Sequence, residues 1–327
     1  MMAKRMTIKD TDAYMVRRFR QRTKAARHDA WLKARAEGVG GSDMATILGL
    51  NRYATPYDLW LEKTGRRPHE DISDKWSVVR GNALETELRR RFRRMHPEWQ
   101  VTDGTDITVI SRSHPVLHAS LDGFIWDPET ESWGVLEIKT ANASRGRTDW
   151  HDTDGNLRAP GYYMAQVTHY MAATGFTWGV FYADIGEAEP VEVRFDRDEQ
   201  DIETVIHAAE EFWGFVQRDE MPMLTGGDVA KAYPEPSQGV QNADGDPQLR
   251  ELFARYAQAQ ERLSDAKDET ATLRDALIVA IGDRQGIRCA GFEASYKPYH
   301  RKAYVRKVAE SNGRMFRFKK LKEPEEE

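Results

Sequence analysis

Residues 133–139 read Trp-Gly-Val-Leu-Glu-Ile-Lys, and their alternation of apolar and polar side chains is typical of a half-buried β-strand. Side chains two positions apart leave a strand on the same face, so Glu137 and Lys139 project together with Val135. Leu136 and Ile138 then point to the opposite face, into a core. The segment predicts a strand that carries an acid and a base on one side and packs with the other.

A second acidic residue precedes this strand. Asp122 ends an apolar-rich segment just before Gly123, where a strand can turn. Asp122 and Glu137 would supply the hard oxygen ligands that a magnesium-type cation prefers. Lys139 would supply a compact positive charge for an attacking water or a pentacovalent phosphate. The three residues together predict a nuclease site.

The same pattern also fits a plainer structure. Two carboxylates and a lysine this close together are common in a chain with 31% charged residues. In that case the segment is a solvated edge strand, and Glu137 and Lys139 form a weak surface pair. Short motifs have high false-positive rates, so the surrounding sequence has to decide between the two interpretations.

Composition limits the class of protein. A chain of 327 residues with 40% hydrophobic residues can form one large domain or two. No apolar run approaches a membrane span, and the basic N-terminus lacks the apolar stretch of a secretory signal. The single cysteine, Cys289, excludes a disulfide framework and a four-cysteine zinc or iron–sulfur site. We expect a soluble protein without a membrane partner, in the cytoplasm of a bacterium or of a phage-infected host.

The net charge of −5 conceals an uneven distribution. Residues 1–35 carry eleven Lys and Arg against three Asp, residues 36–283 carry 25 basic against 44 acidic residues, and residues 284–322 carry twelve against two. Basic ends on an acidic body predict that the ends contact a polyanion, although a solubilising tail would give the same N-terminal pattern. Aromatic residues interleave the C-terminal charges, which suits strands that contact a phosphate backbone or pack on the body: Phe292, Tyr296, Tyr299, Tyr304, Phe316 and Phe318.

Apolar periodicity predicts a mixed α/β chain. We expect helices over 13–37, 44–48, 57–63, 79–95, 160–173 and 200–218, and strands near 100–110, 116–126, 133–140, 178–185 and 190–196. This order predicts an α/β or α+β core around a mixed sheet. A linker at 222–247 leads to a long helix from Leu249 to Ala280, whose apolar spacing favours packing against a helix of this chain or of a neighbouring subunit. The last forty residues predict a β-hairpin or small sheet at 286–297 and 301–308, followed by a basic end.

Five blocks of sequence, in order, resemble the YqaJ-type viral recombinases, relatives of phage lambda exonuclease within the PD-(D/E)xK nuclease superfamily. The blocks lie at 38–60, 80–85, 119–123, 136–139 and 162–170. The resemblance covers about residues 30–220 and implies a restriction-endonuclease-like core with a central mixed β-sheet flanked by helices. We therefore expect a basic segment at 1–29, an exonuclease core at 30–221, a linker at 222–247 and a helical and basic β extension at 248–327.

The resemblance implies a metal centre. Asp122 and Glu137 would ligate one or two Mg²⁺ ions, or Mn²⁺, with the backbone carbonyl of Ile138 as a further oxygen ligand. Lys139 would orient or activate the attacking water and stabilise the transition state. The family usually places a proline before its first acid, whereas Leu121 precedes Asp122 here, and the metal needs only the carboxylate.

The resemblance also implies three residues around the metal centre. Glu85 would face the metal, often through water, although a surface helix residue is the alternative. Gln166 would bind the scissile phosphate or the attacking water. Tyr170, four positions on, shares its helix face and would flank the site or fill the core. His169 lies on another face, and we do not expect it in catalysis.

A phosphate site is implied as well. Ser42 lies at a glycine-rich turn into a helix, where exposed amides and a hydroxyl can bind an anion. Arg35 stands seven positions before it, and the resemblance implies that both hold the 5′-phosphate of DNA. The alternatives are a plain N-cap for Ser42 and an ordinary surface position for Arg35.

The resulting hypothesis is a metal-dependent exonuclease that acts 5′→3′ on double-stranded DNA ends in phage-type homologous recombination. It would release 5′-mononucleotides and leave a 3′ overhang for a single-strand annealing protein, and it would act as a homo-oligomeric ring. One alternative is an endonuclease, or a repair or restriction nuclease, with the same site. The other is a non-catalytic DNA-binding protein on a nuclease scaffold, against which the intact Asp122, Glu137 and Lys139 argue.

Overall fold

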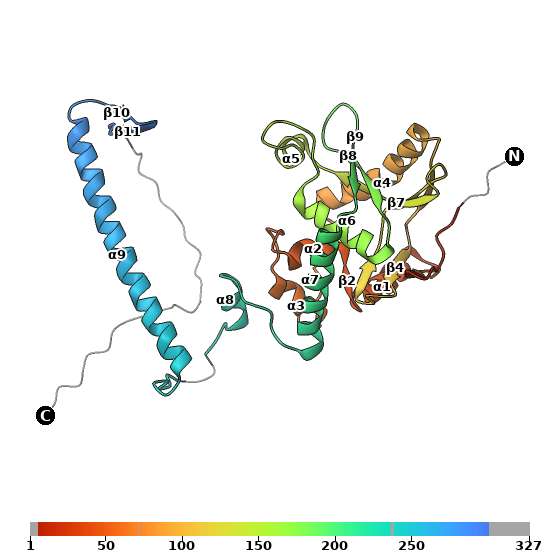
Figure 1. Ribbon diagram of the computed structural model, residues 1–327, viewed down its shortest axis with the longest axis horizontal. Coiled ribbons are helices and arrows are strands. Elements are labelled where there is room, and N and C mark those ends of the chain that lie inside the picture. Colours follow the sequence, from red (N-terminus) through yellow and green to blue (C-terminus); the bar gives the residue numbers. More distant parts are fainter. Residues whose placement is uncertain (1–5, 71, 237–238, 301–327) are drawn as a thin grey trace. The chain divides into compact units, whose positions relative to one another are not determined.

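The computed structural model describes residues 6–70, 72–236 and 239–300 (Figure 1). The chain divides into two compact units, Met1–Val229 and Ala230–Glu327, and each is described by itself. In these described ranges, no helix is both long and apolar enough to cross a membrane.

The main sheet of the first unit is a mixed sheet in which the predicted strand at 133–140 is central. Its order is β3 (Gln100–Asp103), β6 (Gly123–Asp127), β7 (Ser132–Thr140), β8 (Trp178–Asp184) and β9 (Val191–Asp196). β7 pairs antiparallel with β6 and parallel with β8. The interpretation of this segment as a solvated edge strand is therefore wrong.

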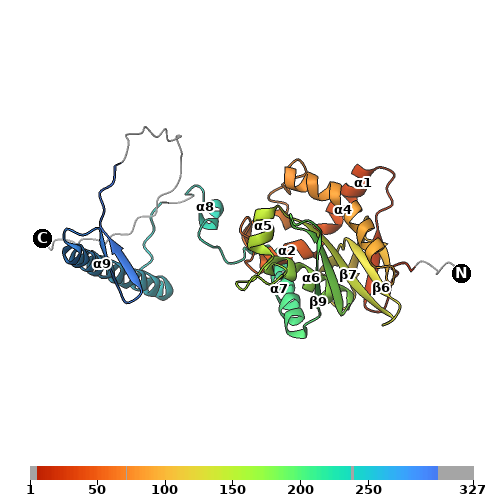
Figure 2. The ribbon, with the colours of Figure 1, turned by 90° about the horizontal axis from the view of Figure 1, so that it is seen from above.

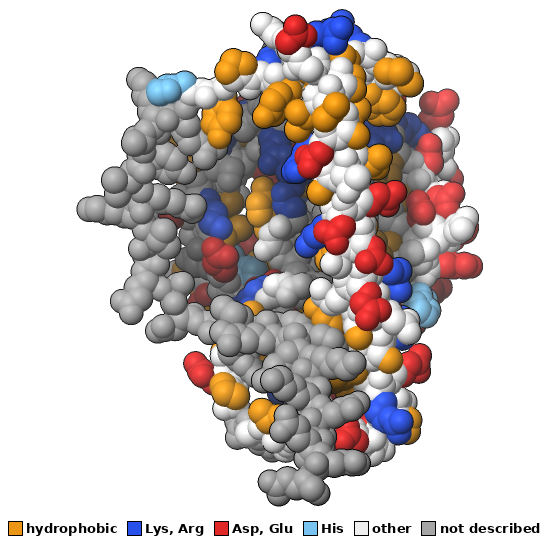
Figure 3. Space-filling view, turned by 90° about the vertical axis from the view of Figure 1, so that its left-hand side faces the viewer, with side chains coloured by type: hydrophobic (Ala, Val, Ile, Leu, Met, Phe, Trp, Pro, Cys, Tyr) orange, Lys and Arg blue, Asp and Glu red, His pale blue; other side chains and the backbone are white. Residues whose placement is uncertain are grey.

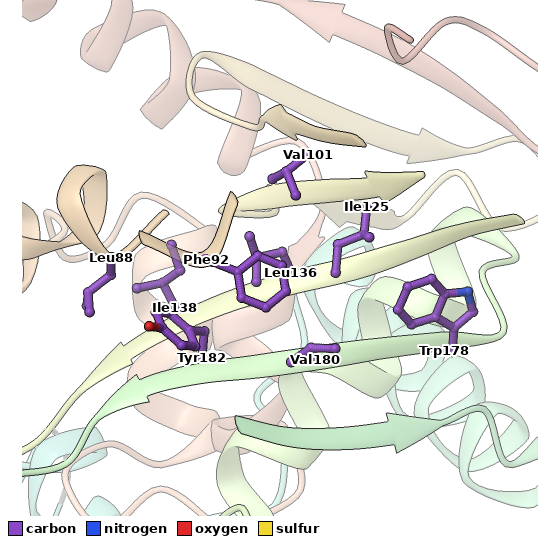
Figure 4. Packing of buried hydrophobic residues seen from close by; sticks show 9 residues of the cluster. All are labelled: Leu88, Phe92, Val101, Ile125, Leu136, Ile138, Trp178, Val180 and Tyr182. Carbon is purple, nitrogen blue, oxygen red and sulfur yellow. The ribbon is translucent and has the colours of Figure 1, made fainter. Parts of the chain in front are cut away.

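Helix α4 (Trp76–Met95) covers one face of the main sheet (Figure 2). Its Leu88 and Phe92 pack on the side of β7 that carries Leu136 and Ile138, as the alternation predicts (Figure 4). The cluster is completed by Val101, Ile125, Trp178, Val180 and Tyr182. Burial of one such side chain contributes roughly 1.5–3 kcal/mol, so this layer fixes β7 firmly against α4.

Helix α6 (Gly161–Thr174) contacts strands of both sheets of the unit. The second sheet has the order β1 (Tyr14–Arg18), β4 (Ile107–Ser111), β5 (Leu117–Ala119) and β2 (Val39–Gly40). α6 contacts β4 and β5 of that sheet and β7 of the main sheet, while α7 (Glu199–Arg218) packs on α6. The helix ends at Gly175, whose φ of 76° lies in the left-handed region that favours glycine. α6 thus presents its side chains to the polar face of β7.

The glycine-rich block allows helix α2 (Gly41–Ile47) to approach α6 closely. A Cβ atom at Gly41 would lie 2.4 Å from a carbon of the Tyr170 ring. Any side chain would displace one of the two helices, so a glycine is needed here. In the chain, α1 (Lys24–Arg35) precedes α2 and α3 (Pro56–Lys63) follows it. The contact between α2 and α6 thus holds the glycine-rich block against α6.

The N-terminal region departs from the prediction of one helix over 13–37. Residues 14–18 form the strand β1, and the helix α1 begins only at Lys24. β1 pairs with β4, with Val16 opposite Val109, and this buries Tyr14 against the ring of Phe176. Pairing with a distant strand outweighs the local helical preference of these residues.

Two predicted strands, near 100–110 and 116–126, each divide into two strands that belong to different sheets. The breaks fall at Gly104 and Asp122, where the Gly104 N–H donates to the Asp122 carbonyl over 3.2 Å. A Cβ at Gly104 would lie 1.9 Å from the Leu121 carbonyl oxygen, so the two chain segments cross in close contact. Asp122 therefore lies where the chain passes from one sheet to the other. A short helix, α5 (Ala143–Asp149), was not predicted.

The second unit contains the predicted long helix and small β element. These are α9 (Pro247–Ile281) and the hairpin of β10 (Gly286–Cys289) and β11 (Phe292–Ser295). Charged side chains follow much of α9 in Figure 3, with hydrophobic ones gathered near the end of the helix that leads to β10. A short helix, α8 (Asp228–Ala232), lies within the predicted linker. The predicted strand at 301–308 lies outside the described residues, as do Tyr304, Phe316 and Phe318. The predicted mixed α/β class with a C-terminal helical and β extension is confirmed.

Buried His169 should make the fold sensitive to acid. Its Nε2–H donates to the His118 carbonyl over 3.1 Å, and burial lowers the pKa of His169 to about 4. Below pH 6.5 the unfolded chain binds a proton that the folded chain does not, so stability falls until the pH reaches about 4. We expect a loss of about 3 kcal/mol from this residue between pH 7 and pH 4.

The measurement is the free energy of unfolding in urea at pH 7 and pH 4.5 for the wild type and His169→Gln. The variant should lose less stability on acidification. His207→Gln, at an exposed position on α7, serves as the control and should behave as the wild type. An equal loss in His169→Gln and the wild type would contradict the assignment.

Candidate active site

A pocket of about 360 Å³ lies where β6 and β7 part. Every residue predicted for the site lines it: Arg35, Ser42, Glu85, Asp122, Glu137, Ile138, Lys139, Gln166 and Tyr170. These residues come from α1, α2, α4, β7, α6 and the segment before β6. The structure thus brings together side chains that are spread over most of the first unit, and their chemical roles remain predictions.

Where β6 and β7 separate, the Asp122 carboxylate takes the place of a backbone carbonyl as the hydrogen-bond partner of β7. The β6–β7 pairing begins at Gly123, which lies opposite Leu136, and the next hydrogen bond on that edge runs from the Ile138 N–H to Asp122 Oδ2 over 2.7 Å. A strand residue directs its N–H and its C=O to the same edge. The Ile138 carbonyl therefore faces the side of Asp122, as expected for two oxygen ligands of one cation.

Glu137 carries the most unusual atom of the site. Its side chain is buried, and Oε1 accepts hydrogen bonds from Lys139 Nζ at 2.6 Å and Gln166 Nε2 at 2.7 Å. Oε2 is also buried, yet it has no hydrogen-bond partner among the described residues. An unpartnered buried carboxylate oxygen is costly, so this oxygen fits the role of a metal ligand.

Carboxylates crowd the pocket. Burial, reinforced by Asp122, raises the pKa of Glu137 to about 8. Burial and Asp122 likewise raise the pKa of Glu85, and burial raises that of Asp122 although Lys139 and the Ile138 N–H oppose the rise. Arg89 forms ion pairs with Glu85 and with Asp103. The carboxylates near the end of β7 therefore outnumber the neighbouring cations, Arg89 and Lys139. Such an excess of negative charge favours binding of a divalent cation.

The donor set suits Mg²⁺ or Mn²⁺. Asp122, Glu137 and the Ile138 carbonyl offer hard oxygen atoms, and Mg²⁺ in proteins is commonly held by one or two carboxylates together with water. In the described parts of the chain, no group of three or more His, Cys, Asp or Glu side chains forms a ready metal cage. The residues present thus fit an open site with two protein carboxylates, which leaves positions for water and a phosphate oxygen.

Lys139 is held as a charged group between the metal ligands and α6. Its Nζ donates to Glu137 Oε1 at 2.6 Å and to Gln166 Oε1 at 3.0 Å, and it lies 4.5 Å from the centre of the Tyr163 ring. Burial alone would lower the pKa of Lys139, but Glu137, Tyr163 and Asp122 together outweigh burial, so the pKa is raised. A charged ammonium donates hydrogen bonds, so this lysine can orient a water and stabilise negative charge.

Gln166 is locked in one orientation by its neighbours. Its Nε2 donates to Glu137 and, at 2.7 Å, to the hydroxyl of Tyr170. The Tyr170 side chain is buried against Gly41, while its hydroxyl belongs to the pocket. Tyr170 is therefore a buried core residue that also lines the pocket, and its role in the reaction stays a prediction. His169 instead bonds the backbone of His118.

Two cations gather around Asp43, beside the Arg35 and Ser42 lining of the pocket. Arg35 forms an ion pair with the buried Asp43, and Lys63 lies 2.8 Å from the same carboxylate. Burial would raise the pKa of Asp43, but Arg35 and Lys63 outweigh it and hold the pKa well below its ordinary value. Two cations share one carboxylate here, and Ser42 lies directly beside it in the chain. Arg35 also stacks over the Trp31 ring, at 5.5 Å.

Several site residues were missed by the sequence analysis. Arg89 stands four positions after Glu85, a helical spacing that could have predicted their ion pair. Tyr163, three positions before Gln166, follows from the same helical face. No sequence spacing predicts the contact of Lys63 with Asp43, because only the folded chain brings α3 beside Asp43.

Part of the sequence matches a known protein family. Residues 30–177 match the family described as the YqaJ-like viral recombinase domain. This segment is similar to the YqaJ-like viral recombinase domains. The resemblance stated from the sequence blocks is thereby confirmed.

One similar protein also matches beyond residues 30–177. The "Uncharacterized protein YqaJ" of Bacillus subtilis (strain 168) is 28% identical over 283 residues, which cover 83% of each chain. Among solved structures, the alkaline exonuclease LHK-Exo from Laribacter hongkongensis is 22% identical with a TM-score of 0.46, over 58% of this chain and 93% of that one. A phage-related exonuclease from Haemophilus somnus 129PT is 14% identical with a TM-score of 0.36, over 56% and 96%.

The pocket should bind Mn²⁺ through Asp122 and Glu137. We expect Mn²⁺ at 100 times its Kd to raise the free energy of unfolding by about 2.7 kcal/mol and EDTA to reverse the effect. Asp122→Asn and Glu137→Gln should abolish it, because each removes a charged oxygen ligand. Calorimetric titration and thermal unfolding measure both quantities.

The matched control is Glu87→Gln, which changes an exposed carboxylate on α4 that pairs with Arg90 at 3.2 Å. It should bind Mn²⁺ as the wild type does. Undiminished Mn²⁺ binding by Asp122→Asn would contradict the proposed ligand set.

Proposed function

We propose that this chain is a metal-dependent DNA exonuclease that acts in phage-type homologous recombination. The observation that carries the proposal is the unpartnered, buried Oε2 of Glu137 in the same pocket as Asp122 and Lys139. The similarity of residues 30–177 to the YqaJ-like viral recombinase domain supports the setting in recombination. DNA is then the substrate, and the reaction is hydrolysis of a phosphodiester.

The residues of the pocket divide the work. Asp122, Glu137 and the Ile138 carbonyl would hold one or two Mg²⁺ ions, which when bound supply an activated water and neutralise the leaving 3′ oxygen. The charged Lys139 would orient that water and stabilise the negative charge that develops on the phosphate. Gln166, locked by Tyr170 and Lys139, would fix the phosphate or water at a set position.

The cations around Asp43 support a direction of cleavage. Arg35 and Ser42 would bind the terminal 5′-phosphate of a DNA end, beside the Asp43–Lys63 pair. A phosphate anchored there would leave a nearby phosphodiester of the same strand at the carboxylates. Cleavage would then release a 5′-mononucleotide, proceed 5′→3′ and leave a 3′ single-stranded overhang. A homo-oligomeric ring and a single-strand annealing partner stay predictions from the sequence.

The direct test is incubation with Mg²⁺ of three DNAs: linear duplex with 5′-phosphates, linear duplex with 5′-hydroxyls, and closed circular duplex. We expect nucleotide release from the phosphorylated linear duplex and none from the circle. Lys139→Ala should lower the rate by at least about 100-fold, because it removes a charge-stabilising donor. Glu87→Gln is the control and should keep the wild-type rate. Nicking of the circle would favour an endonuclease, and binding without hydrolysis would refute the enzyme.

A separate prediction concerns the 5′-phosphate. Arg35→Ala should lower kcat/KM about 10- to 100-fold on 5′-phosphorylated ends, since a hydrogen bond to a charged group is worth about 1.5–3 kcal/mol. Its effect on 5′-hydroxyl ends should be small. Lys33→Ala, at an exposed position of the same helix, should change neither rate. An equal loss on both kinds of end would show that Arg35 does not read the phosphate.

A further inference from the structure

Helix α9 carries a long apolar stripe whose leucines are exposed. The stripe advances by alternating steps of three and four residues, so its members lie on one side of the helix. Its five leucines are 38–58% exposed, although leucine is among the residues that are most often buried. We call the stripe the α9 seam, and it consists of Leu249, Leu252, Tyr256, Ala259, Leu263, Ala266, Thr270, Leu273, Leu277 and Ala280.

The small β element of the second unit leaves these leucines uncovered. β11 contacts α9, and the buried residue of the helix is Ile281, which lies outside the α9 seam. α9 has 35 residues, which corresponds to a length of about 50 Å. A helix in water is held mainly by the packing of an apolar face. Because residues 239–300 provide no such packing for the leucines of the α9 seam, we expect another surface to cover them.

The side chains of the α9 seam match a second copy of the same helix that runs in the opposite direction. About a two-fold axis between residues 264 and 265, the two seams overlap over their full length. Leu249 then faces the partner's Ala280, and Leu263 faces the partner's Ala266, so that large side chains meet small ones. The remaining layers pair Leu273 with Tyr256, Thr270 with Ala259 and Leu252 with Leu277.

A parallel pair would pack less evenly. Each residue of the α9 seam would face its own copy, so that Ala259, Ala266 and Ala280 would form layers of two alanines. Tyr256 would form a layer of two tyrosines in the same helix pair. The distance between two helices depends on the side chains at their contact, and these layers require different distances. The antiparallel arrangement contains neither kind of layer.

Charged residues beside the α9 seam distinguish the two arrangements as well. In the antiparallel pair, Arg262 lies opposite the partner's Glu269, and the two-fold axis repeats this contact. In a parallel pair, Arg262 would lie opposite Lys267, a like-charge contact that offsets the favourable one between Glu269 and Arg274. Arg262 and Glu269 are both exposed, and neither forms an ion pair within residues 6–70, 72–236 and 239–300. The charge pattern therefore favours the antiparallel pair.

We propose that the α9 seam binds the α9 seam of a second copy of this chain in antiparallel orientation. With the residues that flank it, the α9 seam offers about 20 residues per copy, which is the size of a stable protein–protein interface. A two-fold contact closes on itself and joins two copies and no more, so a ring would need a separate interface. The contact needs neither DNA nor a metal ion and goes beyond the proposed function.

The first test is disulfide cross-linking of the full-length chain, with Cys289→Ser in every variant to remove the exposed native thiol. A disulfide forms only where two Cα atoms come within about 7 Å. The double variant Leu252→Cys/Leu277→Cys should form a covalent dimer on mild oxidation, whereas each single variant should not. Ala254→Cys/Asp275→Cys is the matched control, because these exposed positions have the same levels in the pair but lie on the side away from the α9 seam.

Two results of the cross-linking would overturn the proposal. Cross-linking of Leu252→Cys alone and of Leu277→Cys alone would show a parallel pair. Absence of a covalent dimer in the double variant, with the helix content unchanged in circular dichroism, would show that the α9 seams do not meet.

The second test reverses charges without changing the apolar residues. Sedimentation of the full-length chain without DNA or Mg²⁺ gives the Kd of the dimer. Arg262→Glu should weaken the dimer about 10-fold, because two attractive contacts become repulsive. Adding Glu269→Arg to that variant should restore the wild-type Kd. Asp268→Arg is the control, since it reverses a charge on the exposed side of α9 and should leave the Kd unchanged.

The sign of the change decides the orientation. A tighter dimer in Arg262→Glu would indicate the parallel pair and overturn the proposal. An unchanged Kd, or a double variant as weak as Arg262→Glu, would overturn it too, and this is the result expected if a different protein or another segment of this chain covers the α9 seam. Nuclease activity is measured separately, so a chain that degrades linear DNA without this dimer would retain the proposed function and refute the α9 contact.

Discussion

The hydrogen bond from the Ile138 N–H to the Asp122 carboxylate is the contact on which the site depends. It closes the edge of β7 where its pairing with β6 stops, and so it replaces a backbone partner by a charged side chain. That substitution is possible because the chain crosses between two sheets at Gly104 and Asp122. The carboxylate is thereby fixed beside the Ile138 carbonyl and close to Glu137, at a cost that a cation would offset.

The core could be predicted from the sequence where a single period decides the structure. The alternation in β7 correctly placed Leu136 and Ile138 toward α4 and Glu137 toward α6, because the strand period is two. The same local logic failed at residues 14–18, whose partner β4 lies far away in the chain. A local pattern of residues does not reveal which distant strand will pair with them. The basic residues of this segment have a helical pattern but form a strand.

The candidate residues of the pocket could be predicted from the sequence, because they lie in blocks that occur in a fixed order. All of these candidate residues line one pocket. The hollow of about 580 Å³ that adjoins this pocket was not predictable in this way. Its walls come from residues 42–53, the first turns of α4, residues 140–150 around the unpredicted α5, and α6. Trp76 and Tyr53, which both line it, have no sequence relation to each other. Only the folded chain places them beside the pocket.

The most direct measurement is anomalous diffraction from crystals of the protein soaked in Mn²⁺. The proposed ligand set predicts a strong peak within ligand distance of an Asp122 oxygen, Glu137 Oε2 and the Ile138 carbonyl oxygen. A crystal in which Glu137 Oε2 is satisfied by a protein donor, with the Mn²⁺ peak away from Asp122, would contradict it.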